Sequence, residues 1–132
     1  MTVAKHDLRC EAQAPQLARR WTAECLRAHL DDGSAPPTID ALIDDAVLCV
    51  SELVTNAVHA GCSDVTLELR VEDHSVRVAV VDDAPGRPTP RAAAPGDRNG
   101  RGLRLIEAVS RRWGVDPAGP RKAVWAEFAL PA

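Results

Sequence analysis

The 132-residue sequence is poor in aromatic side chains, with three Trp, one Phe and no Tyr. A buried core must therefore consist of Val, Leu, Ile and Ala. No apolar run reaches the roughly 18 residues that a membrane-spanning helix needs, and the N-terminus lacks the apolar segment of a signal peptide. The net charge of −3 offers no basic face for nucleic acid. We therefore expect a cytoplasmic protein that contacts neither membrane nor nucleic acid directly.

The four cysteines are far apart in the sequence, at Cys10, Cys25, Cys49 and Cys62. They include no Cys-x-x-Cys pair and do not cluster with histidines, so the spacing favours neither a zinc site nor a disulfide framework. We expect all four to be small, reduced core residues, as is usual in the cytoplasm.

The length suits one folded domain. We expect a tail and a short strand in residues 1–14, followed by a domain over 15–131. Apolar alternation predicts strands, and apolar residues at helical spacing predict helices. The predicted strands cover 6–12, 65–71, 76–82, a segment from 114 and 122–130; the predicted helices cover 15–29, a long stretch between a capping Thr38 and Gly61, and a segment from 100.

A Pro-, Ala-, Gly- and Arg-rich stretch at 87–99 separates two of these elements and is a candidate lid. The order of elements predicts a two-layer α/β sandwich. In this architecture the helices pack on one face of a mainly antiparallel, mixed sheet.

The long helix carries a polar cluster opposite its apolar face. At about 100° per residue, Asp45, Glu52, Asn56 and His59 fall within an arc of about 60°. Glu52 and Asn56 are four residues apart and are therefore neighbours on adjacent turns. A solvated helix face explains such a pattern in most helices. A binding site is the alternative.

Two later stretches bear on this alternative. The strand that ends at Asp82 is followed by Asp-Ala-Pro-Gly at 83–86, and Gly-Arg-Gly at 100–102 begins the next helix. Either stretch by itself is explained by a tight turn. Backbone N–H groups beside glycines at a helix N-terminus are also suited to binding phosphate. The sequence contains neither a P-loop nor a dinucleotide-binding fingerprint.

Taken in order, these stretches resemble the Bergerat ATP-binding fold of the GHKL superfamily (histidine-kinase-like ATPases), and in particular its anti-sigma-factor serine/threonine-kinase branch in actinobacteria. The resemblance covers about residues 15–131. It rests on the N box, Ser-Glu-Leu-Val-Thr-Asn-Ala at 51–57, on a first Gly box, Val-Asp-Asp-Ala-Pro-Gly at 81–86, and on a second, Gly-Arg-Gly-Leu-Arg-Leu-Ile at 100–106. Arg-Trp-Gly at 112–114 and Val-Trp-Ala-Glu at 124–127 also match this branch.

The resemblance implies ATP and Mg²⁺ as ligands. It makes Glu52 the catalytic residue, which acts as a base or positions the nucleophile, and Asn56 the ligand of Mg²⁺. It makes Asp82 the acceptor of a hydrogen bond from the adenine amino group. The further nucleotide contacts that it implies are Ala84, Gly86, Gly100, Arg101, Gly102 and Leu103.

The resemblance also implies a function and partners. A protein of this branch phosphorylates a Ser or Thr of an antagonist (anti-anti-sigma) protein, sequesters a sigma factor and is expected to form a homodimer. One alternative is a protein-interaction module that acts by partner switching without catalysis. Another is the ATPase half of a histidine kinase, but no helical pair with a phosphoacceptor His precedes the N box.

Three departures from the family pattern leave ATP binding as the expectation and make weak or lost activity the alternative. Ala84 replaces the usual middle Gly of the first Gly box, and a positive φ there would make Ala costly. Ala123 stands at the position assigned to a Thr of the last strand. The spacing between Asn56 and His59 is one residue shorter than in some relatives.

Overall fold

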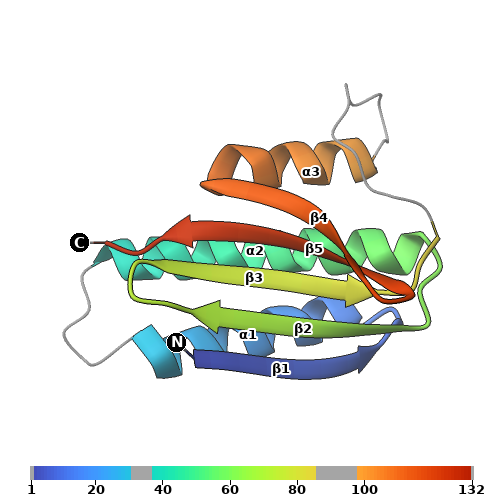
Figure 1. Cartoon of the computed structure of the whole chain (residues 1–132), viewed down its shortest axis with the longest axis horizontal. Helices are drawn as coiled ribbons and strands as arrows, with labels where there is room; N and C mark the ends of the chain where they lie inside the picture. Colours follow the sequence, from blue (N-terminus) through green and yellow to red (C-terminus); the bar gives the residue numbers. More distant parts are fainter. Residues whose placement is uncertain (1, 31–36, 86–97, 132) are drawn as a thin grey trace.

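The computed structural model describes residues 2–30, 37–85 and 98–131. These residues form eight elements, and their order is the one predicted from the sequence (Figure 1). The elements are β1 (Thr2–Arg9), α1 (Ala14–Leu30), α2 (Pro37–His59), β2 (Asp64–Val71), β3 (Ser75–Asp82), α3 (Arg98–Val109), β4 (Arg112–Ala118) and β5 (Arg121–Ala129).

The strands form one five-stranded sheet in the order β1-β2-β3-β5-β4. All four pairings between the described strands are antiparallel, so the parallel pair that a mixed sheet requires is not among them. The predicted hairpin of β2 and β3 is confirmed, with Val71 opposite Val76 next to the turn. In Figure 1, α1 and α2 lie behind the sheet, and α2 packs between α1 and α3. The fold is therefore the predicted two-layer α/β arrangement.

The core lies between the sheet and α2, and it is aliphatic as the composition predicts. Alternate residues of β2 and β3 are buried against the helices, because successive side chains of a strand point to opposite faces. The inward residues are Val65, Leu67 and Leu69 on β2 and Val76, Val78 and Val80 on β3. Phe128 is the one aromatic residue of the described core. No helix among the described residues is long and apolar enough to cross a membrane.

Several predicted boundaries are wrong; one of them is β4, which begins at Arg112 rather than at residue 114. β1 begins at Thr2 rather than at residue 6, and it pairs with β2 over its whole length. Most of its side chains are exposed at the edge of the sheet, so its sequence lacks the apolar alternation that marks a buried strand. Helix α2 begins at Pro37, which places Thr38 inside the helix, and α3 begins at Arg98. Residues 87–97 of the candidate lid lie outside the described residues.

The expectation of four reduced cysteines is wrong for one pair, because Cys10 and Cys62 form a disulfide. They are 52 residues apart in the sequence, but their Cα atoms are 5.8 Å apart. The pairing of β1 with β2 brings them together, and the Cys10 N–H donates to the Ser63 carbonyl at 3.0 Å. Cys25 and Cys49 are not in a disulfide, and Cys49 is buried as expected.

Candidate functional site

The three stretches that carry the resemblance meet at one end of the molecule. The C-terminal end of α2, the end of β3 and the beginning of α3 lie together at the right of Figure 1. Asn56 is in the last turns of α2, and Asp82 is the last residue of β3. The tertiary structure therefore brings the N box and the first Gly box to the same end of the sheet.

Asn56 is buried rather than solvated, because only 8% of its surface is exposed. Both polar atoms of its side chain, Oδ1 and Nδ2, are buried and have no hydrogen-bond partner in the described part of the chain. A buried amide without partners is costly, and most such groups in proteins are paired. Its oxygen is the kind of ligand that Mg²⁺ takes. Asn56 thus fits the role of a metal ligand better than that of a solvated helix residue.

Glu52 lies one turn before Asn56 on α2 and is half-buried. The charge of Glu52 affects the nearby thiol of Cys49. Burial is the main reason why the pKa of Cys49 is raised to about 12, and the negative charges of Asp45 and Glu52 raise it further. Cys49 therefore remains a thiol at neutral pH and cannot act as a thiolate nucleophile. Glu52 is the carboxylate that lies next to Asn56 on this helix.

Ser51, the first residue of the N box, has a structural role. It is buried, and its hydroxyl accepts a hydrogen bond of 2.9 Å from Arg19 Nη1 on α1. This contact fixes α2 against α1 next to Glu52.

Asp82 is almost completely buried, with 3% of its surface exposed. Its Oδ1 accepts hydrogen bonds from the backbone N–H of Ala84 and from Lys122 Nζ, both at 2.8 Å. Lys122 Nζ also donates to the Ala84 carbonyl at 2.6 Å. A buried carboxylate and a largely buried ammonium group therefore form one cluster with the loop that follows β3.

Lys122 was not identified from the sequence, although alternation along β5 contains the signal. Val124, Ala126 and Phe128 point into the core, so Lys122 belongs to the same face. It is also opposite Asp82 in the register of β3 and β5. Ala123, which was assigned to the family's Thr position, lies on the other face of the sheet, in a small pocket beside Arg77 and Trp125.

Ala84 takes its position without backbone strain. None of the described residues other than glycine has a positive φ, so the left-handed conformation that would penalise Ala is not used here. Ala84 is buried, with 7% of its surface exposed. The loop is also held by Asp83, whose Oδ1 accepts the Ser63 N–H at 2.8 Å. This backbone hydrogen bond is the main reason why the pKa of Asp83 is lowered.

The structure gives less support for a ligand contact at the remaining predicted site residues. Leu103 is fully buried in α3 and is part of the core. Gly100, Arg101 and Gly102 lie within the first turns of α3, because the helix begins at Arg98. Gly86 lies outside the described residues.

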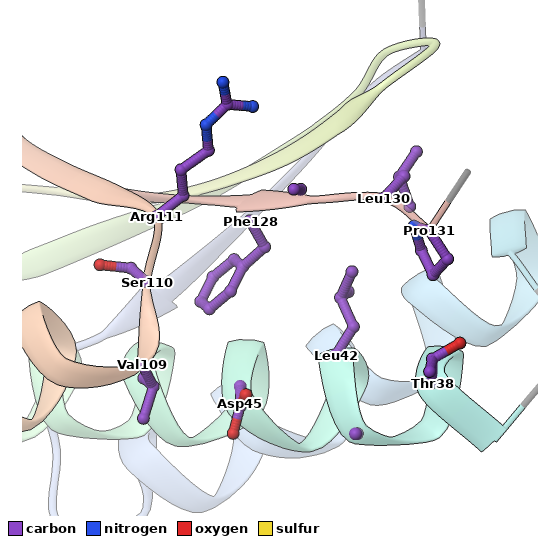
Figure 2. A pocket seen from close by; sticks show the side chains of 11 residues that line it. Thr38, Leu42, Asp45, Val109, Ser110, Arg111, Phe128, Leu130 and Pro131 are labelled. Carbon is purple, nitrogen blue, oxygen red and sulfur yellow. The ribbon is translucent and has the colours of Figure 1, made fainter.

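A second hollow lies at the opposite end of α2. It is an open groove of about 580 Å³ between the N-terminal half of α2, the end of α3 and the end of β5. Figure 2 shows Leu42 pointing from α2 toward the strand and Phe128 pointing from the strand toward α2, with Asp45 on the helix side. Asp45 is eleven residues before Asn56, or about 16 Å of helix rise. The polar residues predicted to lie on one arc of the helix are therefore divided between two sites. Asp45 lines the groove and does not belong to the site around Asn56.

Comparison with known families agrees with this geometry. The sequence model of the histidine kinase-like ATPase domain matches residues 9–127, which is most of the chain. The chain belongs to the histidine kinase-like ATPase domain family. Glu52, Asn56, Asp82, Ala84 and Lys122 of this ATPase domain all lie within the matched range.

The chain is similar to known proteins both in sequence and in structure. A segment of 55 residues, 40% of the chain, is 46% identical to the uncharacterized protein SCO4941 of Streptomyces coelicolor and spans about half (52%) of that protein. The crystal structure of the RsbU and RsbW domains of Rv1364c from Mycobacterium tuberculosis matches the whole chain with a TM-score of 0.66 and 20% identity. The ATPase domain covers 33% of that longer chain, and at this identity the likeness concerns the fold.

Proposed function

We propose that this ATPase domain binds ATP with Mg²⁺ and acts as a regulatory protein of the anti-sigma-factor serine/threonine-kinase type. The observation that carries the proposal is the buried Asn56 amide, whose two polar atoms have no partner among the described residues. Membership in the histidine kinase-like ATPase family supports ATP as the ligand. The N box Ser-Glu-Leu-Val-Thr-Asn-Ala supports the anti-sigma branch.

The residues divide the chemistry between them. Asn56 Oδ1 would ligate Mg²⁺, which neutralises phosphate charge when it is bound, and Asp82 would accept a hydrogen bond from the adenine amino group. Glu52 would orient the hydroxyl of a partner's Ser or Thr and accept its proton. That hydroxyl oxygen then forms a bond to the γ-phosphorus while the bond to ADP breaks.

The partners follow from the same proposal. The phosphorylated protein would be an antagonist (anti-anti-sigma) protein, and the sequestered protein would be a sigma factor. The protein would act in the cytoplasm and as a homodimer.

Calorimetric titration with a non-hydrolysable ATP analogue, with and without Mg²⁺, tests the nucleotide site. We expect saturable binding that is strengthened by Mg²⁺. Absence of binding at millimolar analogue would sink the kinase proposal.

Two single variants test the separate roles on α2. Glu52→Ala should abolish phosphotransfer to a Ser- or Thr-bearing antagonist and leave nucleotide binding nearly unchanged. Asn56→Ala should weaken Mg²⁺-dependent binding by about tenfold or more, as expected for the loss of one charge-assisted contact. Calorimetry and a radiolabelled phosphate-transfer assay measure the two effects.

Asp44→Ala provides a matched control, since Asp44 is an exposed carboxylate on the same helix. It should change neither property. Equal losses of binding in Glu52→Ala and Asn56→Ala would contradict the separate roles.

A second candidate function is a partner-switching module in which nucleotide plays no part. The ion pair between Lys122 and Asp82 favours it, because the carboxylate assigned to adenine already has a cationic partner at 2.8 Å. This candidate predicts no nucleotide binding in the same calorimetric experiment and unchanged partner binding in Glu52→Ala.

A further inference from the structure

Within the part of the chain that the structure describes, the cluster of Lys122, Asp82 and Ala84 leaves hydrogen-bonding capacity unused. Lys122 Nζ carries three N–H groups, and two of them go to Asp82 Oδ1 and the Ala84 carbonyl. Asp82 accepts both of its hydrogen bonds from the described residues at Oδ1, which leaves Oδ2 as an acceptor. Among the described residues, one Lys122 donor and one Asp82 acceptor therefore remain next to each other.

We infer that Lys122 is a base-recognition residue of the nucleotide site and acts together with Asp82. The edge of adenine presents an amino donor, N6, beside a ring acceptor, N1. The remaining Asp82 oxygen complements N6, and the remaining Lys122 N–H complements N1. This inference rests on the proposed ATP site and goes beyond it by naming a second residue that reads the base.

Burial makes this cluster more selective than a surface ion pair. The side chains of Lys122 and Asp82 are 16% and 4% exposed. A donor and an acceptor with little access to water lose more when a ligand leaves them unpaired, and this is how buried polar groups discriminate between similar ligands. The ammonium group also neutralises the carboxylate, so the cluster favours a neutral base over a cationic ligand.

The position of Lys122 depends on the strand register. It is directly opposite Asp82 in the pairing of β3 with β5, on the face that carries the helices. Its contact with the Ala84 carbonyl joins it to the first Gly box. A residue that only fastened this loop to β5 would stabilise the fold without reading the base, and the experiment separates these two roles.

The experiment compares the affinities of two ligands for two proteins, as in a double-mutant cycle. Calorimetry with Mg²⁺ present measures all four affinities. The ligands are ADP and 1-deaza-ADP, in which a C–H group replaces N1. The proteins are the wild type and Lys122→Met, which keeps the length of the side chain and removes the donor. Lys5→Met is the matched control, because Lys5 is an exposed strand lysine on β1 that pairs with Glu68 at 3.7 Å.

In the wild type, replacing N1 should weaken binding about tenfold or more, the loss expected for a hydrogen bond from a charged donor. In Lys122→Met, ADP should bind more weakly by a similar factor, and 1-deaza-ADP should bind about as well as ADP. Lys5→Met should behave like the wild type. Thermal unfolding of each protein checks that it is folded.

Equal affinity of the wild type for the two ligands would overturn the inference and leave the ATP site in place. The inference would also be overturned if 1-deaza-ADP bound to Lys122→Met more weakly than ADP did, by the same factor as in the wild type. No binding of ADP to the wild type would contradict the proposed function itself. If Lys122→Met does not fold, the affinities of the wild type for ADP and 1-deaza-ADP still test whether N1 receives a hydrogen bond.

Discussion

At the scale of single residues, Glu127 shows how this fold stabilises a buried charge outside the candidate site. It lies on β5 and is 7% exposed. It accepts hydrogen bonds from Arg112 Nε at 2.7 Å and from Arg77 Nη2 at 3.3 Å. The guanidinium of Arg77 also lies 3.9 Å from the centre of the Trp125 ring. The hydrogen bond from Arg112, assisted by Arg77, lowers the pKa of Glu127 although burial raises it.

This lowered pKa predicts a pH dependence. A glutamate in the unfolded chain has a pKa of about 4.3, and that of Glu127 is lower in the folded protein. Its contribution to the free energy of unfolding is therefore present above about pH 4.3 and is lost as the pH falls through the folded pKa. Glu127→Gln should lower stability at pH 7 and flatten its fall below about pH 4.3.

Urea unfolding at a series of pH values measures this effect. Glu68→Gln is the control, because Glu68 pairs with an exposed Lys5 at the longer distance of 3.7 Å. A pH slope that is the same in Glu127→Gln and the wild type would contradict the prediction.

At the scale of elements, the end of α2 determines where the chain leaves the site. Gly61 has φ +91° and follows the helix in the left-handed region. Its N–H donates to the Val58 carbonyl at 3.1 Å, and the Cys62 N–H donates to the Ala57 carbonyl at 3.1 Å. These two hydrogen bonds form the Schellman motif that commonly ends helices at glycine. The sequence predicted that Gly61 ends the helix, but not these two hydrogen bonds.

Gly61→Ala should destabilise the protein by about 1 kcal/mol because a Cβ disfavours the left-handed conformation. The effect is conformational, since a Cβ built at Gly61 meets no atom within 4 Å. Gly61→Asn should cost less, because Asn tolerates this conformation. Denaturant titration measures both variants, and an unchanged midpoint for Gly61→Ala would contradict the prediction.

At the scale of the whole molecule, the Cys10–Cys62 disulfide joins the end of β1 to the segment between α2 and β2. It closes a loop that spans 52 residues and contains both α1 and α2. The adjacent Ser63 binds Asp83 in the loop after β3. The bridge therefore fastens the edge strand close to the candidate site.

The loop length predicts that Cys10→Ser with Cys62→Ser lowers the free energy of unfolding by about 2–4 kcal/mol. A reducing agent should destabilise the wild type by a similar amount and leave the double variant unchanged. Cys25→Ser is the control, because Cys25 is not in a disulfide. Equal stability of the oxidised and reduced wild type would contradict the prediction.

The sequence by itself determined the order of the elements and the family. Apolar alternation and helical spacing are local properties, so the strands, the helices and the Gly61 cap followed from neighbouring residues. The N box also identified Asn56 and Glu52 as a pair on one helix. The ends of β1, α2 and α3 were missed because an edge strand and a helix's first turn bury few side chains.

Only the tertiary structure decided which distant residues meet. Sequence separation contains no information about the distance from Cys10 to Cys62, which the pairing of β1 with β2 determines. The same holds for Lys122, which meets Asp82 because β5 is inserted beside β3 in the sheet. The burial of Asn56 likewise depends on packing around α2, which no local pattern specifies. Strand order and register are properties of the whole sheet, and they determined the site's electrostatics.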